Sequence, residues 1–152
     1  MINRPPYAGL SQVCLPATSS ASGDPSRARA SALNIALWIA QVGLALVMVG
    51  VGSVHAFRDE RAVERLPWMA AVGRRGMAVI GILEILGAIG LIAPAVTGVL
   101  VWLTPFAAAM IALLMAFAIV FHSRRGERFV GNVFLLVAAA VVAYGRVAIS
   151  PF

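Results

Sequence analysis

Residues Leu33–Phe57 read LNIALWIAQVGLALVMVGVGSVHAF, an apolar run without a formal charge. A helix needs about 20 mainly apolar residues to cross ~30 Å of hydrocarbon, so this run is long enough for one span. A helix also satisfies its own backbone hydrogen bonds, which no water would satisfy inside a bilayer. The run therefore predicts a first transmembrane helix.

Three more apolar runs follow it. They are Met77–Ala93, in which Glu84 is the single charge, the uncharged run Val99–Phe121, and Phe129–Ile149, which has Arg146 near its end. Membrane-spanning helices contain roughly 17 to 25 apolar residues, so each run qualifies, the first of the three only just. The alternating segments typical of outer-membrane strands are absent from the sequence. We predict an all-α fold, a transmembrane four-helix bundle formed by residues 31–152.

The composition agrees with a membrane protein. Apolar residues make up 61% of the chain and charged residues 12%, whereas soluble domains contain about 25% charged residues. All twelve basic residues are arginines, and the net charge is +6. A basic chain can bind nucleic acid, but these arginines flank apolar runs, as they do in membrane proteins. The expected partner is the lipid bilayer, and nucleic-acid binding is not expected.

Residues 1–30 differ from the rest of the chain because they contain four prolines and a Ser/Ala/Thr cluster. A segment of this kind buries too little apolar surface to become ordered, which predicts a flexible polar tail ahead of the membrane domain. Cys14, the single cysteine, lies in this tail. One cysteine excludes an internal disulfide and a four-thiolate metal site, so a free thiol is expected.

The connections predict how the bundle is oriented. Arg58–Gly76 carries eight charges, His122–Arg128 is basic, and Pro94–Gly98 is a tight, uncharged turn. The two basic loops lie on one side of a four-span bundle and hold eight arginines, against four on the side of the termini. Because arginines accumulate on the cytoplasmic side, the sequence predicts that both termini lie outside.

Glu84 is the strongest candidate for a functional residue. A carboxylate in the middle of a span costs several kcal/mol by most estimates, so it usually faces the bundle interior. Gly81, Gly87 and Gly90 surround it in the sequence, and small residues let a neighbouring helix approach closely. Two interpretations remain open. Glu84 either binds a ligand or relays protons, or it is a neutral carboxyl that makes one interhelical hydrogen bond.

The other polar residues of the spans are distributed unevenly. His55, Arg58, His122 and Asn132 are expected in the same half of the bundle as Glu84, whereas the opposite half offers Asn34, Gln41, Thr104 and Tyr144. We predict a polar pocket that opens toward the basic loops, with the first group as ligand-binding or proton-relay candidates. Simpler roles remain open: histidines at a helix end, Arg58 reaching the headgroups, and Asn132 bonding across helices.

Metal and haem sites are not favoured. Zinc normally takes at least three protein ligands, and the bundle offers only His55, His122 and Glu84. Both histidines are expected near the bundle surface, which does not suit haem. Common catalytic motifs such as GxSxG, the Walker loop and HExxH are absent from the sequence. Whether the protein is an enzyme stays undecided at this stage.

Several segments resemble the DoxX-like family of small bacterial membrane proteins. The most specific is Gly81-x-x-Glu84-x-x-Gly87-Ala-x-Gly90-Leu-Ile-x-Pro94. The resemblance extends to Leu33–Ala40, Gly50–Phe57, Leu66-Pro67-Trp68, Met115–His122 and Ala143-Tyr-Gly145. The wider family is named after a subunit of a membrane thiosulfate:quinone oxidoreductase. The resemblance therefore implies a quinone-linked or redox-associated role in the bacterial inner membrane, although no cysteine lies in the spans to carry out thiol chemistry.

The leading hypothesis is an accessory or small subunit that binds a quinone or another hydrophobic small molecule near Glu84. A proton-coupled transporter is the alternative, because a buried carboxyl can exchange a proton for a cation. Four helices enclose little volume, so a transporter would have to be a homo-oligomer. A structural subunit that assembles with a partner protein, in which Glu84 is dispensable, is the third hypothesis.

Overall fold

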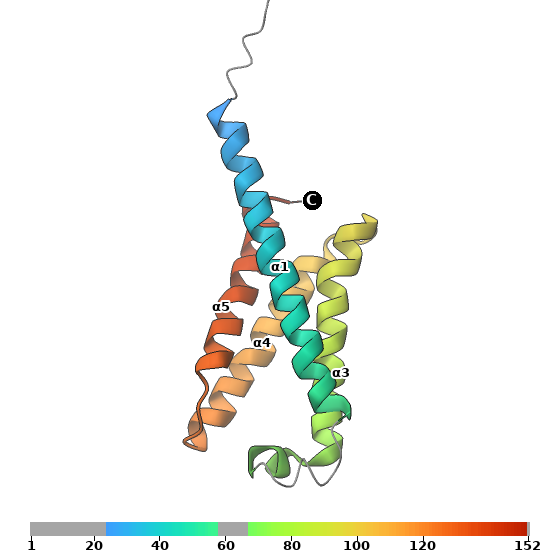
Figure 1. The fold of residues 1–152 in the computed structure, drawn as a ribbon, viewed down its shortest axis with the longest axis vertical. Coiled ribbons are helices and arrows are strands. Elements are labelled where there is room, and N and C mark those ends of the chain that lie inside the picture. Colours follow the sequence, from blue (N-terminus) through green and yellow to red (C-terminus); the bar gives the residue numbers. More distant parts are fainter. Residues whose placement is uncertain (1–23, 58–66, 152) are drawn as a thin grey trace, which may run out of the picture.

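The computed structural model describes residues 24–57 and 67–151, and the part of the chain that it describes consists of helices and short turns, without strands. The elements are α1 (Pro25–Phe57), α3 (Pro67–Thr97), α4 (Leu103–Arg124), α5 (Val130–Tyr144) and a short π-helical segment η1 (Gly145–Ile149) that continues α5 (Figure 1). Four segments of the described chain are long and apolar enough to cross a membrane. The predicted all-α four-helix transmembrane fold is confirmed.

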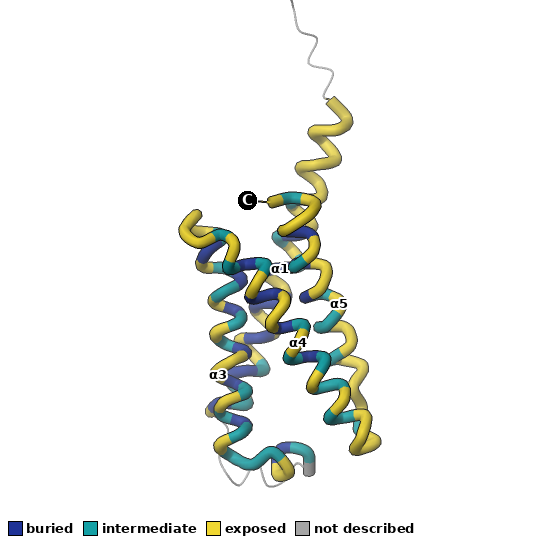
Figure 2. The backbone as a smooth tube through the Cα atoms, turned by 180° about the vertical axis from the view of Figure 1, so that it is seen from behind, coloured by how far each residue is buried: buried dark blue, intermediate teal, exposed yellow. Residues whose placement is uncertain are grey.

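The helices form two pairs that meet at one end of the bundle. α1 packs along α3, and α4 packs along α5, while α3 and α4 join the pairs. Figures 1 and 2 show the two pairs close together near the chain ends and diverging toward the opposite end. The first turns of α3 lie across this open end. The start of α3 therefore lies at the end of the bundle where the two helix pairs diverge, which we call the open end (Figure 1).

Burial follows the pattern expected for a bundle in lipid. The core contains Met48, Leu91, Ala108 and Val142, none of which is measurably exposed. Exposed residues occur along every helix (Figure 2), and many of them are large and apolar, such as Ile39 and Leu46 at 69% exposed. A water-soluble monomer rarely exposes apolar patches of this extent. The outer surface is therefore suited to contact with the hydrocarbon of a bilayer.

Glycines occupy the points where the helices come closest. A Cβ atom on Gly52 would lie 2.8 Å from the carbonyl oxygen of Gly81, and one on Gly81 would collide with the backbone of α1. Cβ atoms on Gly87 and Gly90 would lie 2.9 Å from Ile111 Cγ1 and Ala107 Cβ, respectively. The glycines around Glu84 thus allow close contacts with two helices: Gly81 packs against α1, whereas Gly87 and Gly90 pack against α4.

The first helix begins earlier than the sequence predicted. Asp24 Oδ1 accepts hydrogen bonds from the backbone nitrogen and the hydroxyl of Ser26, at 3.0 and 2.8 Å. These bonds lower the pKa of the Asp24 carboxyl and cap the helix, while Pro25 suits the first helical position. Residues 25–30, assigned above to the tail, are therefore helical. The remainder of the predicted tail, with Cys14, lies outside the described residues.

The second span is longer at both ends than predicted. α3 begins at Pro67, inside the predicted loop, and turns sharply at Gly73, whose φ of 76° favours glycine. Pro94 was expected to start a turn, but it lies inside the helix, which continues to Thr97. A proline removes one backbone hydrogen bond, and near a helix end this loss is tolerated. The connection to α4 consequently lies at residues 98–102.

Candidate functional site

His55 and Glu84 form a buried pair between α1 and α3. His55 Nδ1 lies 2.7 Å from Glu84 Oε2, and the two side chains are only 12% and 4% exposed. The closest contact between α1 and α3 is made by Gly52 and Gly81. His55 lies three residues after Gly52, and Glu84 lies three residues after Gly81. Residues three apart share a helix face, so the contact of the glycines also brings these two side chains together. The pair can hold a proton between a nitrogen and an oxygen atom.

Trp68 lies between the two histidines. Its ring centroid is 5.6 Å from that of His55 and 5.3 Å from that of His122, both in edge-on geometry. The sharp turn at Gly73 separates the short segment that carries Trp68 from the rest of α3, and this segment crosses the open end of the bundle (Figure 1). Trp68 therefore lies at the open end of the bundle, in contact with both histidines.

These side chains surround a cavity of about 570 Å³, which we call the polar cavity. Its volume lies within the ~300–1,000 Å³ that is typical of small-molecule sites. All four helices contribute to the lining, which is mainly apolar. The polar or aromatic-amphipathic members are His55, Trp68, Glu84, His122, Arg128 and Asn132.

The structure thus brings together four of the five residues that the sequence singled out. The fifth, Arg58, lies outside the described residues. Two further polar-cavity residues, Trp68 and Arg128, were not predicted as site residues. Trp68 belongs to the Leu66-Pro67-Trp68 segment, which resembles the DoxX-like family. This resemblance could have indicated that Trp68 is a site residue. Arg128 appeared only as one of several loop arginines.

His122 connects the polar cavity to the loop after α4. Its Nδ1 lies 2.7 Å from Glu127 Oε2, and Arg125 Nε donates to Glu127 Oε1 at 2.9 Å. Desolvation acts to raise the pKa of Glu127, but the hydrogen bonds and charges of Arg125 and His122 outweigh it and lower that pKa. The loop therefore carries an ionised carboxylate in contact with a histidine that also lines the polar cavity.

A second buried polar cluster closes the opposite end of the bundle, centred on Arg146, which is only 3% exposed. Arg146 Nε donates to Gln41 Oε1 at 3.0 Å, and its Nη1 donates to Asn34 Oδ1 at 2.7 Å. The guanidinium also lies over the Trp38 ring, 5.1 Å from its centroid. Gln41 Nε2 in turn donates to the Leu91 carbonyl at 2.7 Å. This cluster links α1, α3 and η1.

The burial of Arg146 corrects one expectation. Arg146 was counted above among the four arginines on the side of the termini, but its guanidinium lies inside the bundle. Buried charges need hydrogen-bonding partners, and Asn34 and Gln41 supply them from α1. Without Arg146, the excess of arginines in the basic loops is larger, so the predicted orientation is unchanged.

The described residues contain no group of three or more His, Cys, Asp or Glu side chains arranged to hold a metal ion. His55 and His122 each pair with a different carboxylate. The chemistry that these two pairs offer is hydrogen bonding and proton exchange.

The comparisons with known proteins agree with the resemblance seen in the sequence. The sequence profile of the DoxX-like family matches residues 39–145. The match includes every polar-cavity residue named above, whereas Asn34, Trp38 and Arg146 fall outside it. Searches of curated proteins and of solved structures find no significant match. Because the profile covers most of the chain and four described segments can cross a membrane, this multi-pass membrane protein belongs to the DoxX-like family.

Proposed function

We propose that the protein is a small subunit of a quinone-linked redox system in the bacterial inner membrane, and that the polar cavity binds the quinone head group. One observation carries the proposal: the buried His55–Glu84 pair lines a cavity of about 570 Å³ whose other walls are largely apolar. A flat ring with carbonyl oxygens matches this combination of apolar walls and few polar groups. The resemblance to a family named after a quinone-reducing complex supports the same ligand.

The proposed role of the pair is to exchange protons with the bound ring. A quinone takes up protons at its carbonyl oxygens when electrons enter the ring, and a proton donor must lie within about 2.6–3.2 Å of the acceptor atom. His55 Nδ1 and Glu84 Oε2 lie 2.7 Å apart, a distance at which a proton can pass from one atom to the other. The electrons come from a redox centre of a partner subunit, which makes this chain the quinone-binding component of the assembly.

The first experiment is an organic extraction of the protein purified in mild detergent, followed by an absorption spectrum of the extract. We expect a quinone in stoichiometric amount. Binding of a tailless benzoquinone is then measured by quenching of tryptophan fluorescence. We expect quenching by the wild type that is lost in Trp68→Phe, since Trp68 lines the polar cavity.

Glu84→Gln tests the role of the carboxylate, and Asp24→Asn, which changes an acid at the start of α1 outside the cavity, is the matched control. We expect affinity for the benzoquinone to fall at least tenfold in Glu84→Gln, which corresponds to about 1.4 kcal/mol, with little change in unfolding temperature. Asp24→Asn should bind like the wild type. Wild-type protein that does not bind the ring, or full binding by Glu84→Gln, would contradict the proposal.

A proton-coupled transporter is the second candidate, and the same buried pair supports it. A carboxylate held by a histidine next to a cavity can release a proton when a cation enters. Proteoliposomes separate the two functions, because only a transporter moves protons across the membrane when a substrate is added. If Glu84→Gln changes neither binding nor proton movement, the third hypothesis, a structural subunit, is favoured.

A further inference from the structure

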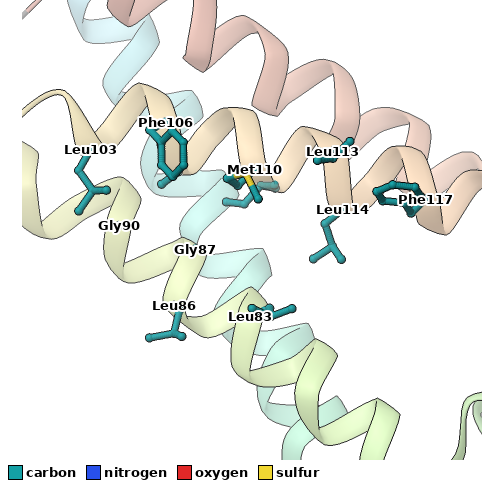
Figure 3. Close-up of a pocket in the computed structure, with 12 residues that line it drawn as sticks. Leu83, Leu86, Gly87, Gly90, Leu103, Phe106, Met110, Leu113, Leu114 and Phe117 are labelled. Atoms are coloured by element: carbon teal, nitrogen blue, oxygen red, sulfur yellow. The ribbon is translucent and has the colours of Figure 1, made fainter.

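A second cavity, which we call the apolar groove, lies between α3 and α4 on the outer surface of the bundle. Its volume is about 400 Å³, and every residue that lines it is apolar or glycine. Figure 3 shows Leu83 and Leu86 of α3 opposite Phe106, Met110 and Leu114 of α4. From Leu103 to Phe117, the groove follows α4 over ~21 Å of helix axis. This shape suits an extended, apolar chain.

The apolar groove adjoins the polar cavity. Leu114 and Phe117 line both of them. On the opposite wall, Leu83 lines the apolar groove while the next residue, Glu84, lines the polar cavity. Figure 3 shows α3 and α4 close together near Gly90 and Leu103 and farther apart near Leu83 and Phe117. The wide end of the apolar groove is therefore the end that borders the polar cavity, which the His55–Glu84 pair lines.

We propose that the apolar groove holds the isoprenoid tail of the quinone whose head group occupies the polar cavity, and that the ligand enters between α3 and α4 from the bilayer. This inference rests on the proposed function. The shared residues Leu114 and Phe117 carry it, because a tail attached to a ring beside Glu84 has to pass them. A lipid chain alone would occupy the apolar groove without any link to the polar cavity.

The tail gains little free energy by moving from lipid into the apolar groove, because lipid chains are as apolar as leucine side chains. The apolar groove therefore determines where the tail lies and how the ring is oriented. A measurement of position tests the inference more directly than a measurement of affinity.

The test uses a quinone that carries a photoreactive diazirine at the end of its tail, with the protein in lipid nanodiscs. After irradiation, labelled residues are identified by mass spectrometry. We expect label on the groove-facing residues of α3 and α4, such as Met110, and loss of this label when an unlabelled tailed quinone is added. Label spread evenly over the lipid-facing residues of all helices would overturn the inference.

Two pairs of variants provide matched controls. Leu83→Trp fills the apolar groove, whereas Ile82→Trp changes a neighbour that is equally exposed (52% against 50%) and lines neither cavity. On α4, Leu113→Trp fills the apolar groove and Val120→Trp does not. We expect labelling of Met110 to fall at least fivefold in the first member of each pair only. Equal labelling within both pairs would refute the inference.

Binding of the tailless benzoquinone separates this inference from the proposed function. If Leu83→Trp loses the specific label and still binds the tailless ring, the apolar groove is the tail site. If the ring binds but a diazirine-bearing fatty acid labels Met110 as strongly as the tailed quinone does, the apolar groove is a general lipid site and the inference is wrong. If the wild type does not bind the ring, the proposed function fails, and the inference with it.

Discussion

His55 Nδ1 and Glu84 Oε2 lie 2.7 Å apart. The two residues follow Gly52 and Gly81, respectively, by three positions, and these glycines form the contact between α1 and α3. The same backbone approach that packs the two helices therefore also forms the polar pair. Because Gly52 and Gly81 leave room for no Cβ atom, the distance between the helices is defined at this point. Packing and site chemistry are consequently coupled, and substitutions can test them together.

Gly81→Ala should destabilise the bundle and separate the pair. The new methyl group would meet the backbone of Gly52 and Ala56, and overpacking of this kind typically costs about 1–3 kcal/mol. Gly50→Ala is the control, because a Cβ atom there meets nothing within 4 Å, and a helical alanine is about 0.5–1 kcal/mol more favourable than glycine. Thermal unfolding in detergent should show opposite shifts. Equal shifts would disprove the close contact at Gly81.

His55→Ala should destabilise the protein because it leaves the buried Glu84 without its histidine partner. Removal of one partner of a buried hydrogen bond costs about 1–3 kcal/mol. A double-mutant cycle with Glu84→Ala isolates the interaction between the two side chains. We expect the double variant to be less destabilised than the sum of the single variants, as measured by denaturant or thermal unfolding. Strict additivity would mean that the pair does not form.

Arg146→Met should lower the unfolding temperature without changing the polar cavity. The substitution removes the bonds to Asn34 and Gln41, and unsatisfied buried groups cost about 1–3 kcal/mol. Arg146→Lys should restore little, because an ammonium cannot reproduce the planar geometry of the guanidinium. The control is Arg124→Met, at an exposed position, which should have little effect. If Arg124→Met is as destabilising as Arg146→Met, the cluster is not a specific connection.

The loop after α4 should lose stability in acid. Arg125 and His122 hold the pKa of Glu127 below its ordinary value. A carboxyl with a lowered pKa in the folded state stabilises the fold above its unfolded pKa, and this contribution disappears as the pH falls through the folded pKa. The unfolding temperature of the wild type should therefore fall more steeply than that of Glu127→Gln once the pH drops below the ordinary glutamate pKa of 4.5. Identical pH profiles would exclude a role for Glu127.

The sequence predicted the spans well because each is a long apolar run, and hydrocarbon demands such runs. It also selected Glu84, since a charge in such a run is costly wherever it points. The predictions that were wrong or missing concern the direction of the chain and of the side chains, which composition does not encode. The turn at Gly73 places Trp68 at the open end of the bundle (Figure 1). The composition of the charged loop does not indicate the direction of this turn.

Arg146 shows a second reason for failure. It stands near the end of the last run, where an arginine normally reaches the membrane surface. Its hydrogen-bonding partners Gln41 and Asn34 lie 105 and 112 positions away in the sequence. Whether they meet depends on the rotation and tilt of α1 relative to the end of α5. These angles follow from packing between helices, which a single sequence does not reveal.

The divergence of the two helix pairs makes the molecule polarised. The Arg146 cluster closes one end, while the polar cavity, His122 and Glu127 all belong to the other. A reaction in the polar cavity would therefore exchange protons with a single aqueous compartment, and its ligand would be drawn from the part of the membrane nearest the open end. In a cell, such chemistry would be vectorial: every proton taken up in the cavity would be withdrawn from the same side.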